Sequence, residues 1–137
     1  MKRYVFDACA LVAFFNEEDG ADIVEDLLAE ASSGRCVIIM NKYNLLDVYY
    51  GYLRDNGVNF ADRILSIVEN SNIQIYDVLT NTLLRHAGRF KATHKISLAD
   101  AVALAQAVVE QAVLVTADHH ELDAVNESGE VEFLWVR

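Results

Sequence analysis

The sequence predicts an α/β protein, a three-layer α/β/α sandwich around a central four- or five-stranded, mostly parallel sheet. Short β-branched runs alternate along the chain with longer segments of helical spacing, which is typical of right-handed β-α-β crossovers. The strand-like runs are almost entirely apolar, as expected for strands covered by helices on both faces. The 137 residues suit a single domain spanning residues 1–137, and there is no proline-containing linker or repeat to divide it.

The expected strands are short runs rich in valine, isoleucine and aromatic residues, at 4–6, 37–40, 73–76, 113–116 and 131–136. Between them, apolar residues recur every three or four positions, which predicts amphipathic helices. These helices are expected at 22–31, 43–54, 61–68, 81–91 and 98–111. In open parallel sheets, ligands bind beyond the carboxyl ends of the strands, where the strand order reverses. We therefore expect functional side chains just after the strands.

The composition is that of an ordinary globular protein, with 53% hydrophobic and 23% charged residues. No apolar run approaches the roughly 20 residues needed to span a bilayer, so no membrane association is expected. The basic and apolar N-terminus resembles a signal peptide, but Asp7 interrupts the apolar run and acids replace a cleavage site. We interpret it as the first strand of a cytoplasmic protein. Cys9 and Cys36 lack metal-ligand spacing and are expected to be buried free thiols.

The net charge of −10 argues against strong nonspecific binding to nucleic acid or to an anionic membrane. The charge is unevenly distributed, however, because residues 78–99 contain no acid at all. This basic strip contains, besides two histidines, four cationic residues: Arg85, Arg89, Lys91 and Lys95. They are candidates for contacts with a phosphate backbone. The alternative is an ordinary solvated helix face.

Three aspartates lie where the predicted sheet should present functional groups. Asp7 directly follows the first strand, Asp118 follows the fourth, and Asp100 lies in the first turn of the helix that precedes the fourth strand. Each also has an ordinary structural interpretation. Asp7 could cap a helix, Ser97 and Asp100 have the spacing of a capping box, and Asp118 could be a turn residue.

Asp47 is the fourth candidate, and it lies in the middle of a predicted helix, where aspartate is a poor helix former. Asn44 and Gly51 share its side of the helix and form a narrow polar stripe with it. Gly51 is expected to leave space beside the carboxylate. The alternative is a solvent-facing stripe on an amphipathic helix. The remaining positions are expected to belong to the core: Leu45, Leu46, Val48, Tyr49 and Tyr50.

Four carboxylates at one edge of a sheet repel one another unless a cation is present. Oxygen ligands select Mg²⁺ or Mn²⁺ over zinc, and neither cysteine has the spacing of a competing site. His119 and His120 are adjacent in sequence and are expected to form a surface pair. A carboxylate-held Mg²⁺ beside a basic strip fits the hydrolysis of phosphodiesters. Glu17, Glu121 and Asp123 are further acids that could reach this pocket.

Four segments together resemble the PIN domain family, and more narrowly the ribonuclease toxins of VapBC-type toxin–antitoxin pairs. They are YVFDACALVAFFNEE, YNLLDVYYGYLR, ISLADAVALAQA and VLVTADHHELD, and with their spacing they cover essentially the whole chain. The resemblance implies a parallel α/β/α fold and Mg²⁺- or Mn²⁺-dependent endoribonuclease activity. It also implies a homodimer and a small VapB-like antitoxin, whose C-terminal segment can place a basic side chain in the acidic pocket.

The resemblance also assigns residues to the family's metal-binding acids. The first acid falls on Asp7, the third on Asp100 and the fourth on Asp118, with the accompanying hydroxyl on Thr116. The second acid is usually glutamate, and this chain has Asp47 there instead. Because aspartate is one methylene shorter, either the helix lies closer or a water bridges Asp47 to the metal. We expect Asp47→Glu to retain or raise the metal-dependent activity.

Three functional interpretations remain open at this level. The first is a toxin-type endoribonuclease, and the second is a non-toxin PIN-like protein that processes or binds RNA. The third is a receiver-like signalling domain with an acidic Mg²⁺ pocket. The third is disfavoured, because a receiver requires two adjacent acids after the first strand and a lysine after the fifth.

Overall fold

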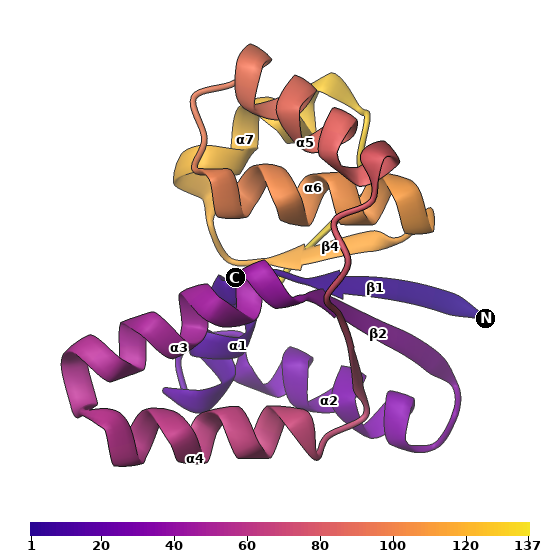
Figure 1. The fold of residues 1–137 in the computed structure, drawn as a ribbon. Coiled ribbons are helices and arrows are strands. Elements are labelled where there is room, and N and C mark those ends of the chain that lie inside the picture. The colour runs from indigo at the N-terminus through magenta and orange to yellow at the C-terminus, as the bar shows by residue number, and fades with distance from the viewer.

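The computed structural model describes residues 1–137 and contains one five-stranded sheet (Figure 1). The strands lie in the order β3-β2-β1-β4-β5, and every neighbouring pair is parallel. Their bounds are Lys2–Phe6 for β1, Cys36–Asn41 for β2, Ile73–Tyr76 for β3, Val113–Thr116 for β4 and Phe133–Trp135 for β5. The predicted sheet is therefore confirmed, with five strands.

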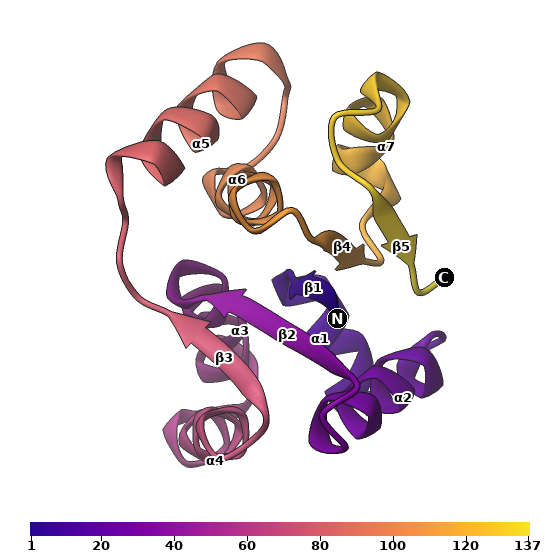
Figure 2. The same cartoon turned by 90° about the vertical axis from the view of Figure 1, so that its right-hand side faces the viewer.

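Seven helices cover the two faces of the sheet (Figure 2). One face carries α1 (Ala8–Phe15), α2 (Ala21–Ser32), α3 (Lys42–Asn56) and α4 (Val58–Glu69). The opposite face carries α5 (Asn81–Thr93), α6 (Leu98–Glu110) and α7 (His119–Ser128). The three-layer α/β/α architecture predicted from the sequence is confirmed. None of the helices combines the length and the apolarity that crossing a membrane requires.

The predicted element bounds agree closely with the structure. Strands β3 and β4 match to the residue, and four of the predicted helices are two to four residues longer than expected. Two helices were not among the predicted segments. The sequence indicates α1 only through the possible cap at Asp7, and α7 begins with two histidines and a glutamate that give no apolar periodicity.

Two hydrophobic clusters form the core, one on each face of the sheet. The first joins α1 to α4 with the sheet and includes Phe6, Leu11 and Met40. The second surrounds α6, whose residues from Asp100 to Ala107 are all buried between α5 and the sheet. A helix that is covered on nearly every side is held rigidly, so the first turn of α6 is a fixed platform for side chains.

The strand order reverses between β1 and β4, in the centre of the sheet. Ligands of open α/β sheets bind in the crevice at such a switch point, beyond the carboxyl ends of the two strands. The order also excludes the receiver-like interpretation, because receiver domains have the flavodoxin-like order 2-1-3-4-5.

Two residues fix the positions of helices around the sheet. The side chain of Asn41 caps α3 by accepting from the Tyr43 amide, and its Nδ2 donates to Gln106 Oε1 on α6 at 3.0 Å. The start of α3 is thus tied to α6 on the other face. Gly20 begins α2 with a positive φ, where an added Cβ would lie 2.2 Å from the Val136 carbonyl oxygen, so only glycine fits there.

Candidate active site

Asp7 lies at the end of β1, where it is fully buried and caps α1. Its Oδ1 accepts from the Ala10 amide at 2.9 Å, and its Oδ2 accepts from the Thr116 hydroxyl. Both carboxylate oxygens are therefore already bound by the protein. The helix-cap interpretation of Asp7 is correct, and the cap also places the carboxylate at the switch point between β1 and β4.

Thr116 links the ends of the two central strands. Its hydroxyl donates to Asp7 and accepts from the Asp118 amide at 3.1 Å, while the side chain is completely buried. Asp118 in turn caps α7, because its Oδ1 accepts from the Glu121 amide at 3.3 Å. One hydroxyl therefore sets the relative positions of Asp7 and Asp118.

Asp100 enters the same region from the first turn of α6. Ser97 caps this helix, and its Oγ accepts from the Asp100 amide at 3.1 Å. In a complete capping box the Asp100 carboxylate would reach back to the Ser97 amide. Here the Ser97 amide instead donates to Glu121 Oε2, at 3.4 Å. Half of the predicted capping box is present, and the Asp100 carboxylate is left for another purpose.

Helix α3 forms the opposite wall of the region. Asn44 is buried, and its Nδ2 donates to the Ala99 carbonyl at 2.8 Å, which ties α3 to the first turn of α6. Asp47 lies one turn further along and is exposed to solvent. The hydrogen bond to the Ala99 carbonyl defines the amide orientation of Asn44, since only the side-chain nitrogen can donate to a carbonyl.

These elements enclose a pocket of about 190 Å³ at the carboxyl edge of the sheet. We call it the acidic pocket, and its lining residues are Ala8, Cys9, Asn44, Asp47, Ser97, Ala99, Asp100, Asp118 and Glu121. Three of the four predicted aspartates line it directly. The fourth, Asp7, lies beneath it and is connected to it through Thr116.

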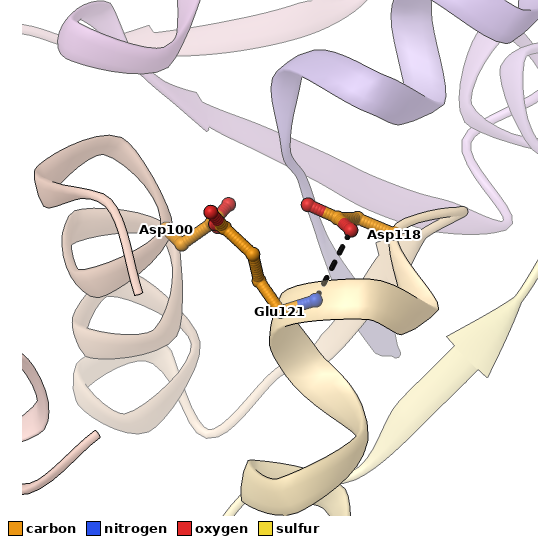
Figure 3. Close-up of side chains that lie close together, drawn as sticks. All are labelled: Asp100, Asp118 and Glu121. Atoms are coloured by element: carbon orange, nitrogen blue, oxygen red, sulfur yellow. Dashed lines mark hydrogen bonds between the residues drawn. The ribbon is translucent and has the colours of Figure 1, made fainter. Parts of the chain in front are cut away.

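Three carboxylates in the pocket converge closely enough to share one ion. Asp100, Asp118 and Glu121 each offer an oxygen within 4.8 Å of the others. Figure 3 shows the carboxylates of Asp100 and Glu121 side by side, with Asp118 facing them from the start of α7. The sequence analysis named Glu121 only as an acid that could reach the pocket. Its spacing of three residues from Asp118, the same as that of Asp100 from Ser97, is the signal that places it in the first turn of a helix.

Burial and the neighbouring acids disfavour negative charge at the bottom of the pocket. Burial raises the pKa of Asp7 from 3.8 to about 6, against the lowering effect of its hydrogen bonds to Thr116 and Ala10. Burial also raises the pKa of the Cys9 thiol, and the charges of all four aspartates raise it further. Cys9, which is only partly buried, thus stays a neutral thiol beside the carboxylates.

Asp100 and Glu121 shift each other's pKa in opposite directions. Burial raises the pKa of Asp100, and its contact with the Glu121 carboxylate and the charge of Asp7 raise it further. The pKa of Glu121 is lowered, first by its hydrogen bond with Asp100. Without a cation, burial and the neighbouring carboxylates therefore favour the neutral form of Asp100 over its ionised form.

Two buried oxygens around the pocket have no hydrogen-bond partner, Asp100 Oδ2 and Asn44 Oδ1. A buried acceptor without a partner costs about 1–3 kcal/mol, so such atoms are rare in folded proteins. Both residues line the acidic pocket. Hard divalent cations such as Mg²⁺ and Mn²⁺ prefer oxygen ligands, and the free oxygens and converging carboxylates of this pocket are such ligands.

Two expectations about the helix that carries Asp47 were wrong, and the metal-binding role of Asp47 itself stays a prediction. Asp47 lies outside the group of three converging carboxylates. An added Cβ at Gly51 would meet nothing within 4 Å, so this glycine is not needed to make room for the carboxylate. Leu46 and Tyr50 were expected in the core but are 58% and 54% exposed. They lie on the outer side of α3, because Leu45 and Val48 occupy the buried side.

The residues of the basic strip do not share one face. Arg85 and Lys95 are exposed and have no ion-pair partner, whereas Arg89 pairs with Glu130 at 2.9 Å and lies over the Phe90 ring. Lys91 donates to the Ile96 carbonyl at 2.6 Å and is close enough to Glu121 to lower the pKa of that carboxyl. Helix α5 and the segment after it therefore place two free cations, Arg85 and Lys95, outside the pocket, while Lys91 lies toward the pocket.

The two adjacent histidines have different surroundings. His119 stacks on the Trp135 ring, with 3.9 Å between ring centroids, and pairs with Asp123 at 2.8 Å. It therefore anchors the start of α7 to β5. The histidines were expected to form a surface pair, and His119 is indeed half exposed without joining the carboxylate cluster.

Comparison with known proteins identifies the family. The model of the PIN domain matches residues 4–127. The chain belongs to the PIN domain family. Its acidic pocket thus occupies the carboxyl edge of a PIN domain sheet. No curated protein sequence matches the chain.

Several solved structures are similar to this PIN domain over nearly their whole length. VapBC2 from Rickettsia felis, bound to a DNA fragment from its promoter, matches with a TM-score of 0.72 and 17% identity, covering 96% of this chain and 97% of that one. DNA-bound VapBC from Salmonella typhimurium matches with a TM-score of 0.72 and 16% identity, covering 100% of both chains. The sarcin-ricin loop cleaving toxin VapC20 from Mycobacterium tuberculosis matches with a TM-score of 0.70 and 17% identity, covering 88% and 94%. At such low identity, these matches support the fold alone.

Proposed function

We propose that this PIN domain is a Mg²⁺- or Mn²⁺-dependent endoribonuclease, and that it is the cytoplasmic toxin of a toxin–antitoxin pair. The observation that carries the proposal is the convergence of Asp100, Asp118 and Glu121 beside two buried oxygens without partners. Repulsion among these carboxylates is relieved most effectively by a divalent cation. The similar VapC20 structure is that of a toxin that cleaves the sarcin-ricin loop, which supports RNA as the substrate class.

The site residues fall into two groups. Asp100 and Asp118 would hold the cation directly, while Asp7 supports Asp118 from below through the Thr116 hydroxyl. Asp47, at the exposed rim, would act through a water molecule. The bound metal would lower the pKa of a water and offset negative charge on the phosphate.

The surrounding residues prepare the pocket for a phosphodiester. Ser97 and Asn44 hold the first turn of α6 in place, the former as its cap and the latter through the Ala99 carbonyl. Arg85 and Lys95 are free to contact the phosphate backbone, with Arg89 and Lys91 as further candidates. The acidic pocket would repel the substrate without the metal, so the cation would be required for binding as well as for chemistry.

The proposed partners fit two different surfaces. A VapB-like antitoxin would place a basic side chain into the acidic pocket, where the carboxylates of Asp100, Asp118 and Glu121 offer a complementary charge. Structures of VapBC complexes are among the similar structures. A short reading frame directly upstream that encodes a small DNA-binding protein would favour this toxin over a PIN-like protein that processes RNA without an antitoxin.

A second copy of the chain would fit an apolar groove of about 690 Å³ between α3, α5 and α6. Its lining includes exposed leucines from all three elements: Leu46, Leu84 and Leu98. The only charged residues that line the groove are Lys42 and Asp77. In a dimer with two-fold symmetry each patch meets itself, so the lysine of one copy can pair with the aspartate of the other.

The test is RNA cleavage by the purified protein in Mg²⁺, Mn²⁺ or EDTA, with Asp7→Asn and Asp100→Asn in parallel. We expect cleavage only with a metal, and a loss of about 100-fold or more in the Asp100→Asn variant, because a ligand of the ion is weakened. Glu127→Gln, an exposed acid on α7, is the matched control and should leave the rate unchanged. Cleavage that persists in EDTA, or full activity in both aspartate variants, would contradict the proposal.

A further inference from the structure

We propose that the exposed face of the His119 ring binds an unpaired nucleobase of the RNA by stacking, next to the phosphate that is cleaved. This inference rests on the proposed ribonuclease function and adds a site for a base to the site for the phosphate. The ring is the last of three that we call the aromatic stack, at the outer edge of the sheet (Figure 2): Phe133 and Trp135 on β5, and His119 at the start of α7.

The three rings of the aromatic stack lie nearly parallel. The centroids of Phe133 and Trp135 are 5.0 Å apart, with 6° between the ring planes. The His119 ring lies on Trp135 at 3.9 Å and 14°. Because His119 Nε2 also donates to the carbonyl of Arg137, the His119 ring lies on the side of Trp135 away from Phe133. The stack therefore ends in His119, the residue directly after Asp118, which lines the acidic pocket.

The His119 ring is held firmly while one of its faces is open. Its Nδ1 bonds to Asp123 Oδ1 at 2.8 Å, and its Nε2 bonds to the Arg137 carbonyl oxygen at 2.7 Å. With both nitrogens bonded and one face on Trp135, the 48% of the side chain that is exposed lies mainly on the opposite face. A ring that is already ordered loses little conformational entropy on binding, so the open face is preorganised for a planar ligand.

Anchoring of α7 to β5 accounts for the covered face of His119 and for its two hydrogen bonds, and it leaves the open face unexplained. Open faces of ordered aromatic side chains are a common means of binding unpaired bases, because every base has an aromatic face of its own. Strand β5 is an edge strand, and no further strand covers its outer side. A single RNA strand therefore has access to the end of the aromatic stack.

The charges around the aromatic stack differ from those of the acidic pocket. Asp123 is bonded to His119 itself, and Glu18 pairs with the neighbouring Arg137 at 2.8 Å. Both acids have partners, so they repel a nucleic acid strand less than the converging carboxylates of the pocket do. A strand whose phosphate lies at the pocket would thus place a flanking base on His119. The basic strip offers contacts to phosphates, whereas this stack offers a contact to a base.

The test is RNA binding by the full-length protein in Mg²⁺, with Asp100→Asn as the parent so that the RNA is not cleaved. Fluorescence anisotropy with a labelled polyuridylate of about ten nucleotides measures the affinity. We expect His119→Gln to weaken binding about tenfold, because the loss of one base stack has an effect of this size. His119→Phe keeps a ring on Trp135 and should bind within about twofold of the parent.

His120→Ala is the matched control, since His120 is also exposed but takes part in no ring stack, and it should leave the affinity unchanged. An RNA duplex of the same length is the control ligand. Its bases are paired and offer no free face, so the parent and the His119→Gln variant should bind it equally well.

The order of the two His119 variants separates base stacking from anchoring. Glutamine can still donate a hydrogen bond to the Arg137 carbonyl but has no ring, whereas phenylalanine has a ring and no polar atom. If His119 acted only by anchoring α7 through its hydrogen bonds, His119→Phe would be the weaker binder and would have the lower melting temperature. That order would overturn the stacking role.

The outcomes also distinguish this inference from the proposed function. If His119→Gln binds the single strand as tightly as the parent, or if His120→Ala weakens binding just as much, the stacking role is overturned and the metal-dependent ribonuclease stands. If binding depends on the His119 ring as expected while the unaltered protein cleaves no RNA in Mg²⁺ or Mn²⁺, the ribonuclease is overturned and the site for the base stands.

Discussion

Helices α3 and α6 border two hollows of opposite character. The first two turns of α3 and the first turn of α6 present Asn44, Asp47 and Asp100 to the acidic pocket of about 190 Å³. Neighbouring positions on the same turns present Leu46 and Leu98 to the apolar groove of about 690 Å³. One hollow concentrates charges that repel one another, and the other exposes apolar side chains to water. Both arrangements are energetically unfavourable. A bound cation would relieve the repulsion in the pocket, and a second apolar surface would cover the side chains of the groove.

The difference between the hollows lies in what the fold already satisfies. In the acidic pocket, helix caps and the Thr116 hydroxyl hold most of the polar atoms, and only two buried oxygens are free. The acidic pocket is therefore preorganised for a small ligand such as a single cation. The groove has no comparable network, and its exposed side chains can be covered only by a surface of similar size.

The largest expected effect concerns the acidic pocket and pH. The pKa of Asp7 is raised to about 6 in the folded protein, so its contribution to stability is present below its unfolded pKa of 3.8 and is lost as the pH rises through 6. This change is about 3 kcal/mol for Asp7, and the raised pKa of Asp100 extends the loss to higher pH. Urea unfolding in EDTA should therefore show a lower free energy of unfolding at pH 8 than at pH 5.

The Asp7→Asn variant tests whether the ionisation of Asp7 causes this pH dependence. Asparagine can still accept from the Ala10 amide but cannot ionise, so this variant should lose a large part of the pH dependence. Saturating Mn²⁺ should reduce the loss of stability in the unaltered protein. A free energy of unfolding that stays level or rises between pH 5 and pH 8 in EDTA would contradict the description of the pocket.

A smaller effect is expected from the apolar groove. Leu46→Glu or Leu84→Glu should weaken self-association about tenfold or more, because each would bury an unpaired carboxylate at an interface of two copies. The free energy of unfolding of the monomer should change little, since both leucines are more than half exposed. Analytical ultracentrifugation over a range of concentrations measures the association.

The matched control for the groove is Ile67→Glu. Ile67 is 54% exposed on α4 and does not line the groove, so this variant introduces the same charge at a comparable but distant apolar position. Equal self-association in all three glutamate variants and the unaltered chain would show that the groove is not the interface.

The smallest effect is expected outside both hollows, on the basic strip. Arg85→Ala and Lys95→Ala should each weaken RNA binding by a few-fold and lower the salt slope by about 1, because each removes one phosphate contact. Arg89→Ala should have less effect, since its guanidinium is engaged by Glu130. Fluorescence anisotropy in the Asp100→Asn background, at several KCl concentrations, measures binding without cleavage.

Arg54 provides the control for the strip. It is an exposed arginine at the end of α3, paired with Asp55 at 2.8 Å. If Arg54→Ala weakens RNA binding as much as Arg85→Ala does, the binding follows overall charge and the strip has no special role.

The acidic pocket and the apolar groove also differ in how well the sequence predicts the positions of their residues. Asp7, Asp100 and Asp118 were placed correctly because strand ends and helix starts are local features, and parallel strands bring them to one edge. Leu46 and Tyr50 were misplaced because an apolar residue on an exposed helix face has the same sequence pattern as one in the core. Apolar periodicity identifies the apolar positions of a helix. It does not distinguish the positions that pack in the core from those that stay exposed.

Glu121 was underestimated for a different reason. An acid in the first turn of a helix is common, because it interacts favourably with the helix dipole, so the sequence alone gives it no special role. Only the packing of α7 against the start of α6 brings its carboxylate to Asp100. The hydrogen bond from the Ser97 amide to Glu121 joins residues that are 24 positions apart, and no local pattern encodes it.

The hydrogen bond between Thr116 and Asp7 joins residues that are 109 positions apart in the chain. Closing so long a loop is entropically costly, and contacts between segments distant in sequence slow folding. The acidic pocket therefore cannot assemble on a ribosome-bound chain that has not yet reached β4, however early β1 is made. If the proposed toxin function is correct, this order of events keeps the nascent chain inactive until nearly all of the domain has been synthesised.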